Sequence, residues 1–147
     1  MKSIECVIDN ADMWMFKFEH LKKNLAGYIY KDIVSSQTNV EVLNANFDVE
    51  RSYEIIGLFE WYWGGWNSTP NADVMQIVAK KWYEKYDAEL IRISHDTLSF
   101  KCRKLSENEA QILMQEINNL SAEIIGCSAG KLLDHLMEKQ SFTLWWD

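Results

Sequence analysis

Residues 126–130, Gly-Cys-Ser-Ala-Gly, match G-x-S-x-G, the turn that carries the nucleophilic serine of α/β-hydrolases. That serine needs an acid and a histidine from later, separate loops, but only seventeen residues, 131–147, follow. Asp134 and His135 are adjacent on one expected helix and therefore point in different directions. A phosphate-binding loop is also excluded, because Leu132 stands where Ser or Thr would bind the metal. We interpret the segment as a glycine-rich turn from strand to helix.

Histidine and cysteine spacing gives no sign of a metal site. His20, His95 and His135 each lack a second histidine or cysteine within helical or hairpin reach. His95 and Asp96 could form an acid–base pair, but aspartate is expected in a tight turn in any case, because its side chain satisfies nearby N–H groups. The sequence predicts neither a metal nor a cofactor.

Scattered carboxylates leave one catalytic alternative open. Glycoside hydrolysis uses two carboxyl groups roughly 5 to 9.5 Å apart. The acids that could converge in this way are Glu84, Glu89, Glu116 and Glu123. Solvated faces or pairs with nearby lysines are the more common fate of such acids.

Residues 60–70, EWYWGGWNSTP, hold four aromatic residues, two glycines and the only proline of the chain. Glycine ends a helix readily, so the segment predicts a corner between two helices. Trp63 and Trp66 are expected to fix this corner to the core. Indole and phenol groups around a glycine turn would also form a rigid recognition surface. The candidate recognition residues here are Trp61, Tyr62, Trp66 and Asn67.

Hydrophobic periodicity predicts one α+β domain over residues 1–147, with a mixed or antiparallel sheet and helices packed on it. Strands are expected at 4–8, 28–34, 40–47, 88–93, 97–103, 123–125 and 142–146. Helices are expected from Asp9 to a stop at Gly27, from Asp48 to Trp63, and at about 71–86, 106–120 and 129–139.

Two helices carry more detailed expectations. In helix 71–86 the spacing predicts a buried stripe of Val74, Ile77, Val78 and Trp82, after a Thr69 cap with Pro70 at the first helical position. In helix 106–120, Ser106 and Glu109 form a capping box. Its expected buried stripe is Ala110, Leu113, Met114, Ile117 and Leu120.

Several of these segments resemble one protein family. They are Trp66-Asn67-x-x-Pro70, then Trp82, Tyr86, Ala88 and Glu89 in the pattern W-x-x-x-Y-x-A-E, then Asp96-Thr97-Leu98. The chain from Val42 onward resembles an uncharacterised bacterial domain family of unknown function that has a G-W-N-x-x-P corner, a W-x-x-x-Y-G-A-E junction and an aspartate-centred hairpin. Residues 1–41 lie outside this resemblance.

The resemblance implies further correspondences and two differences. An acidic helix position corresponds to Glu116, the segment after it to residues 120–123, and the aromatic tail to Trp145-Trp146-Asp147. Asp87 replaces a family glycine, so aspartate is expected to adopt left-handed backbone there. A cysteine–proline pair of the family is missing. The further candidate binding residues are Glu89, Asp96, Glu116, Glu123 and Trp146.

Charge and composition narrow the choice of partner. Fifteen Lys and Arg against 22 Asp and Glu give a net charge of -7, which disfavours nucleic acid and anionic membranes and favours a basic partner.

Three cysteines without disulfide spacing predict a reducing compartment, the cytoplasm. No apolar stretch is long enough for a membrane span or a signal segment.

Three function classes follow. The favoured one is a small acidic bacterial protein-interaction module that neutralises a basic toxin or effector. The alternatives are a small hydrolase that uses Glu89, Glu116 and Glu123 beside the aromatic corner, and a carbohydrate-binding module with open tryptophan faces. The sequence does not predict an oligomeric state.

Overall fold

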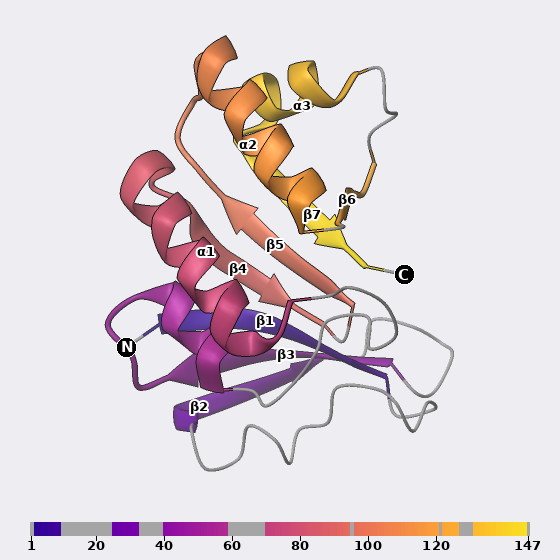
Figure 1. The fold of residues 1–147 in the computed structure, drawn as a ribbon. Helices are drawn as coiled ribbons and strands as arrows, with labels where there is room; N and C mark the ends of the chain where they lie inside the picture. The colour runs from indigo at the N-terminus through magenta and orange to yellow at the C-terminus, as the bar shows by residue number, and fades with distance from the viewer. Residues whose placement is uncertain are drawn as a thin grey trace.

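A computed structural model describes residues 2–9, 25–32, 40–58, 70–94, 96–120, 122–126 and 131–146. Its centre is a seven-stranded mixed sheet in the order β2-β3-β1-β4-β5-β7-β6 (Figure 1). The strands are β1 (Lys2–Asp9), β2 (Leu25–Asp32), β3 (Val40–Phe47), β4 (Glu89–Ile93), β5 (Thr97–Lys101), β6 (Glu123–Ile124) and β7 (Ser141–Trp145). The predicted α+β class with a mixed sheet is confirmed.

β1 lies between the two halves of the sheet. It pairs antiparallel with β3 from Lys2 opposite Phe47 to Asp9 opposite Val40. On its other side it pairs parallel with β4, through Glu5 opposite Arg92 and Cys6 opposite Ile93. The N-terminal strand therefore joins β2 and β3 to the rest of the sheet.

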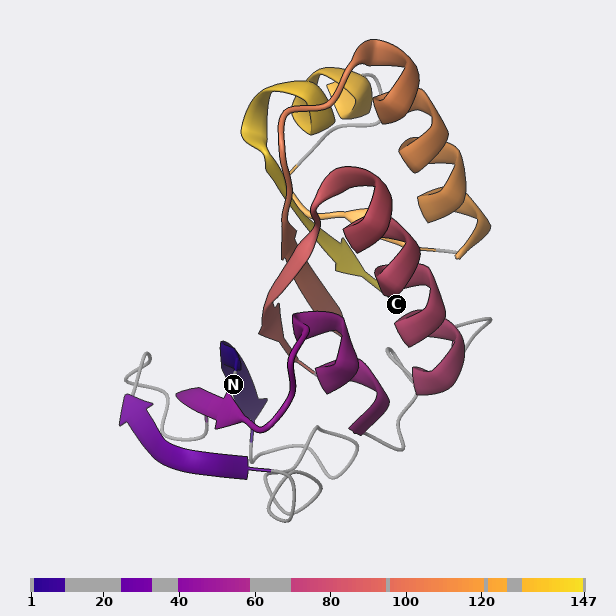
Figure 2. The same ribbon diagram turned by 90° about the vertical axis from the view of Figure 1, so that its left-hand side faces the viewer.

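Helices cover one face of the sheet. The 3-10 helix η3 (Ser52–Leu58) packs on α1 (Ala72–Tyr86), and α2 (Glu107–Asn119) lies farther along the same face (Figure 2). The shorter α3 (Leu132–Lys139) lies at one end, against α2 and β7. None of the described helices is long and apolar enough to cross a membrane.

The start of α1 differs from the expectation. Asn71 is the N-cap, and its side chain accepts a hydrogen bond from the Val74 N–H at 2.9 Å. Pro70 therefore precedes the cap and does not occupy the first helical position. Asparagine caps helices better than threonine, which accounts for the later start.

The buried face of α1 is also rotated from the expected one. Val74 and Ile77 are 46% and 63% exposed, so the stripe predicted through them is wrong. Trp82 of the predicted stripe is buried as expected, but the helix is turned so that Tyr86 and small residues that allow close approach face inward with it. The buried residues are Ala72, Met75, Ala79, Trp82 and Tyr86.

The other expectations for the elements hold in part. The Ser106–Glu109 capping box is present, and Ala110, Leu113 and Ile117 of α2 are buried. Leu98, Phe100 and Cys102 are buried as predicted, but Ser99 between them is also buried, at 7% exposed, so the alternation expected for β5 holds only in part. Gly27 lies inside β2, so the helix end predicted there is wrong. The expected helix after Asp9 falls mainly on residues 10–24, outside the described residues.

The junction after α1 uses left-handed backbone. Asp87 has φ 54° and ψ 31°, and its N–H donates to the Tyr83 carbonyl at 3.0 Å. The next N–H, of Ala88, donates to the Trp82 carbonyl at 3.3 Å. The left-handed aspartate expected here is confirmed, and it turns the chain directly from α1 into β4.

We expect Asp87→Gly to stabilise the protein by roughly 1 kcal/mol. Left-handed backbone costs a non-glycine residue about 1–2 kcal/mol, and the larger entropy that glycine loses on folding offsets part of the gain from removing this cost. Asp87→Asn separates the effect of the charge, and Asp87→Val should destabilise because a β-branched residue resists positive φ. Urea denaturation midpoints measure this order. A valine variant as stable as the parent would contradict it.

Candidate functional site

Part of the predicted recognition surface lies outside the described residues. This applies to Trp61, Tyr62, Trp66 and Asn67, and also to Ser128 of the G-x-S-x-G segment. The roles expected for these residues stay predictions.

Glu89, a candidate catalytic acid, joins η3 to the sheet. Its carboxylate accepts a hydrogen bond from the Ser52 hydroxyl at 2.5 Å. The same hydroxyl accepts from the Leu90 N–H at 2.9 Å. Since Ser52 is buried, these bonds satisfy its polar group and fix η3 on the start of β4.

The other two acids have different surroundings. Glu116 of α2 accepts a hydrogen bond from the indole N–H of Trp82 at 3.1 Å. Glu123 is exposed at the start of β6, opposite Trp145 in the strand register. Among the described contacts none joins Glu89, Glu116 and Glu123 to one another. The carboxylate pair that a hydrolase would need is therefore not supported by these contacts.

Asp96 organises the turn between β4 and β5. Its carboxylate accepts from the Ser94 hydroxyl at 3.0 Å and from the Trp145 indole N–H at 3.0 Å. Its carbonyl accepts from the Trp146 N–H at 3.1 Å. These bonds tie the turn to the end of β7, as expected for an aspartate whose main role is in the turn.

Trp146 is a core residue in this structure. Only 2% of its surface is exposed, and its indole N–H donates to the Leu120 carbonyl at 2.9 Å. The surface role predicted for Trp146 does not fit this burial.

The described cysteines are poor nucleophiles. Cys6 and Cys102 are free and buried. Burial raises the pKa of the Cys6 thiol to about 12 and also raises the pKa of Cys102. Because the thiolate is the reactive form, both thiols stay inert near neutral pH. Within the described residues no group of histidines, cysteines and acids could hold a metal ion.

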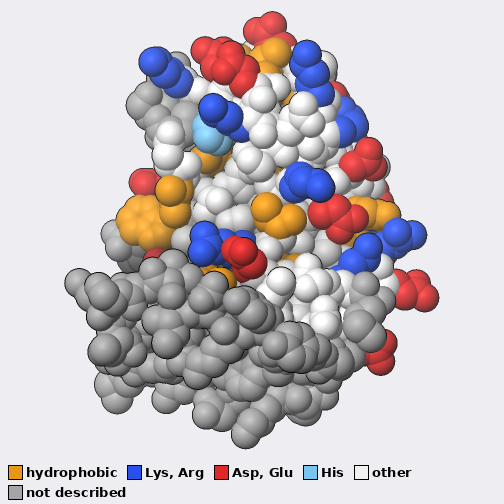
Figure 3. Space-filling model, turned by 180° about the vertical axis from the view of Figure 1, so that it is seen from behind, with side chains coloured by type: hydrophobic (Ala, Val, Ile, Leu, Met, Phe, Trp, Pro, Cys, Tyr) orange, Lys and Arg blue, Asp and Glu red, His pale blue; other side chains and the backbone are white. Residues whose placement is uncertain are grey.

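A polar groove of about 560 Å³ lies on the sheet face away from α1 and α2. Figure 3 shows this side of the molecule, where much of the surface is backbone and uncharged polar side chains. Strands β1, β3, β4, β5 and β7 and helix α3 contribute to the groove. Its polar lining includes Glu5, Asn44, Arg92, Ser99, His135 and Thr143.

A bulge in β4 places Arg92 in this groove. The register shifts between Leu90, which is opposite Phe100, and Arg92, which is opposite Ser99. A bulge adds one residue to a strand, so Ile91 and Arg92 both line the groove while Leu90 and Ile93 stay buried. The sequence predicted only a strand at residues 88–93, and no local pattern marks the bulge that turns Arg92 into the groove.

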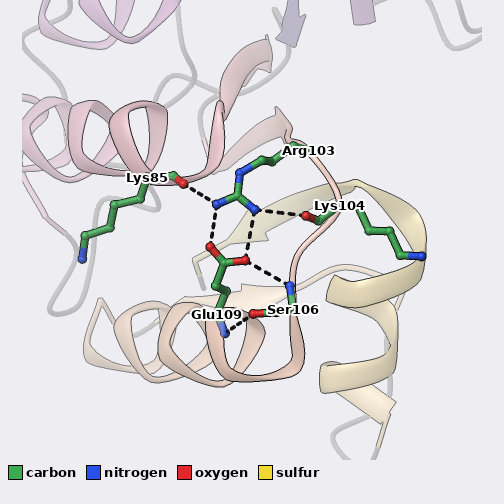
Figure 4. Close-up of polar contacts among 5 residues, drawn as sticks. All are labelled: Lys85, Arg103, Lys104, Ser106 and Glu109. Carbon is green, nitrogen blue, oxygen red and sulfur yellow. Dashed lines mark hydrogen bonds and ion pairs between the residues drawn. The ribbon is translucent and has the colours of Figure 1, made fainter.

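Two arginines of the described chain have very different surroundings. Arg103 donates to both carboxylate oxygens of Glu109 and to the carbonyls of Lys85 and Lys104, at 2.5–3.1 Å (Figure 4). We call these residues, with Ser106, the Arg103 clasp; it joins the end of α1 to the start of α2. The Nε of Arg92, in contrast, is closed off from solvent without a hydrogen-bond partner.

The outer face of α2 has an unusual composition. The helix contains no Lys or Arg, whereas α1 contains three lysines. Its exposed side chains are mostly amides around Ile112, which is 40% exposed. We call this surface the amide face of α2; its residues are Asn108, Gln111, Ile112, Gln115, Asn118 and Asn119.

Comparison with known families identifies the C-terminal part of the chain. The model of a domain of unknown function, DUF4253, matches residues 45–147. The chain belongs to the DUF4253 family. The match begins within β3, three residues after the start of the region that resembles an uncharacterised family, and covers the rest of that region. Searches of curated proteins and of solved structures returned no match.

We expect Glu116→Ala to destabilise the protein by about 1–3 kcal/mol, because it leaves the buried Trp82 N–H without an acceptor. Glu116→Gln keeps a carbonyl oxygen and should cost less. The exposed Glu123→Ala should change stability by under about 0.5 kcal/mol. Chemical denaturation tests this, and a neutral Glu116→Ala would argue against a structural role for the acid.

Because of the Arg103 clasp, we expect the folding stability of the protein to fall at low pH. Hydrogen bonds from the Arg103 guanidinium and the Ser106 N–H lower the pKa of Glu109 from 4.5 to about 2. A lowered pKa stabilises the fold above the unfolded value, and this contribution is lost as pH falls from about 4.5 through 2.

We therefore expect Glu109→Gln to flatten the fall of the denaturation midpoint between these pH values. Glu107→Gln removes the same charge from the same turn of α2 without altering the clasp, so it should keep most of the parent slope. Urea titrations at several pH values would measure both. Equal slopes for the parent and Glu109→Gln would show that the clasp has no such role.

Proposed function

We propose that this protein is a non-enzymatic interaction module that binds a basic protein partner through the amide face of α2. The observation that carries the proposal is the composition of that face: neutral amides surround one exposed isoleucine, and the helix has no cation. Lysine is depleted at protein interfaces, whereas a merely solvated helix commonly carries it, as α1 does.

Charge favours a basic partner. The chain has a net charge of -7, and Glu107 and Glu116 lie on the same helix as the amide face. Complementary charge increases the association rate and excludes acidic proteins. In this proposal the chain is a bacterial, cytoplasmic protein that neutralises a basic toxin or effector.

The contacts of the described residues favour binding over the two alternatives. Glu89, Glu116 and Asp96 each accept hydrogen bonds within the fold. The indoles of Trp82 and Trp146 are buried, which does not suit them to stacking on a sugar.

A photo-crosslinking amino acid in place of Gln115 tests whether the amide face of α2 is the binding surface. We expect discrete adducts with a basic protein in cells of the source organism, and none from the same residue at Lys81 on α1, which is also exposed. An acidic or neutral partner at Gln115 would contradict the proposed charge complementarity.

Once the partner is purified, its affinity can be compared for a matched pair of variants. Ile112→Arg adds a cation to the amide face and should weaken binding by about tenfold or more, because like charges oppose association. Ile77→Arg makes the same change on α1, where Ile77 is 63% exposed, and should change affinity by less than about twofold. Equal losses in the two variants would contradict α2 as the interface.

A further inference from the structure

We infer that the groove on the open face of the sheet binds a small organic carboxylate, with its charged group at Arg92 and an aliphatic body against Ile91 and Ile125. This site lies on the opposite face of the sheet from the amide face of α2, and the inference does not depend on the proposed protein partner. The volume of about 560 Å³ falls within the range of small-molecule sites, about 300–1,000 Å³.

Arg92 supplies the charge for this recognition. Its nearest ionic partner, Glu5, contacts Nε at 3.5 Å, which is too long for a good hydrogen bond. No described hydrogen bond uses its guanidinium, whereas Arg103 makes four. The Arg92 side chain is 43% exposed, so its amino groups can reach a ligand. The planar guanidinium matches a carboxylate with two parallel hydrogen bonds.

Neighbouring groups add hydrogen-bond donors. The hydroxyls of Ser99 and Thr143 lie 2.8 Å apart in a cross-strand pair. One hydroxyl donates to the other, so the second keeps its proton for an external acceptor. Asn44 uses its carbonyl oxygen to accept from Ser3, which leaves its amide N–H groups as donors. A ligand rich in acceptors, such as a carboxylate, fits these groups.

The Glu5 carboxylate opposes the binding of anions at Arg92. It lies directly opposite Arg92 in the parallel pairing of β1 and β4, and its side chain is 54% exposed. A carboxylate ligand must displace this weak contact and approach a like charge. Removing the Glu5 charge should therefore strengthen anion binding, which is the opposite of the usual effect of mutating a site residue.

The groove also has an apolar part. Ile91 and Ile125 both line it and are 40% and 49% exposed. An aliphatic body would cover these side chains and gain stability from their burial. This combination favours a carboxylate on a branched aliphatic body over a bare anion such as phosphate.

Titration of the 15N-labelled full chain by NMR tests the inference. The probes are 4-methylpentanoate, a free acid, and N-acetylleucine, which resembles a peptide C-terminus; their relative affinities distinguish the two sources of the carboxylate. Saturable shifts are expected at Arg92, Ser99 and Thr143. N-acetylleucinamide lacks the charge, and acetate and inorganic phosphate lack the aliphatic body, so each should bind at least about tenfold more weakly.

Variants identify the residues responsible. Arg92→Met should weaken binding of the acid with the higher affinity by about tenfold or more. Glu5→Gln should strengthen binding of the same acid by about two- to fivefold. Arg51→Met is the matched control, because Arg51 lies over the ring of Tyr83 in α1, outside the groove; it should leave affinity unchanged. If Arg92→Met does not fold, Arg92→Lys keeps the charge without the planar group and should still weaken binding several-fold.

The inference would be overturned by the absence of saturable binding for both acids, by equal affinity for N-acetylleucinamide, or by equal losses in Arg92→Met and Arg51→Met. Weaker binding in Glu5→Gln would also overturn it. None of these outcomes bears on the basic protein partner, which is tested at Gln115, Ile112 and Ile77.

Discussion

Burial of the Trp82 side chain is the constraint on which most of this fold depends. The indole is fully buried, meets the rings of Phe100 and Phe142 edge-on at 5.5 and 5.7 Å, and donates to Glu116. Four elements, α1, α2, β5 and β7, therefore meet at one side chain. An aromatic group of this size that has its polar atom satisfied favours one arrangement of its neighbours over looser ones. The carbonyl of the same residue helps to end α1 before β4.

The opposite face of the sheet depends on a different constraint, the insertion of β1 between β3 and β4. β1 lies outside residues 45–147, which match the DUF4253 family, yet it carries Glu5 and Ser3 of the groove. The groove is thus completed by a strand from outside the family match. Two faces of one sheet consequently have different roles: one is filled by helices and the aromatic core, and the other leaves Arg92, hydroxyls and amides open to a ligand.

The contrast between the two arginines shows how neighbours determine what a side chain can do. In the Arg103 clasp, one carboxylate and two carbonyls use the donors of the guanidinium, so the residue stabilises the α1–α2 connection. At Arg92 the bulge of β4 turns the side chain to the open face, where Glu5 is its only described ionic partner. The same chemical group is structural in one place and available for binding in the other.

The sequence by itself determined the Ser106–Glu109 capping box, the burial of Leu98, Phe100 and Cys102, and the α+β class, whereas the left-handed Asp87 was expected from the family resemblance. The capping box and the buried positions of β5 arise from residues a few positions apart. Tertiary structure decided which stripe of α1 is buried, where β1 is inserted and how the β4 bulge aims Arg92. The reason is that Val74 and Ile77 fit helical spacing as well as Met75 and Ala79 do, and only packing around Trp82 selects between them. Glu5 and Arg92 are likewise brought together by a strand pairing that no local pattern specifies.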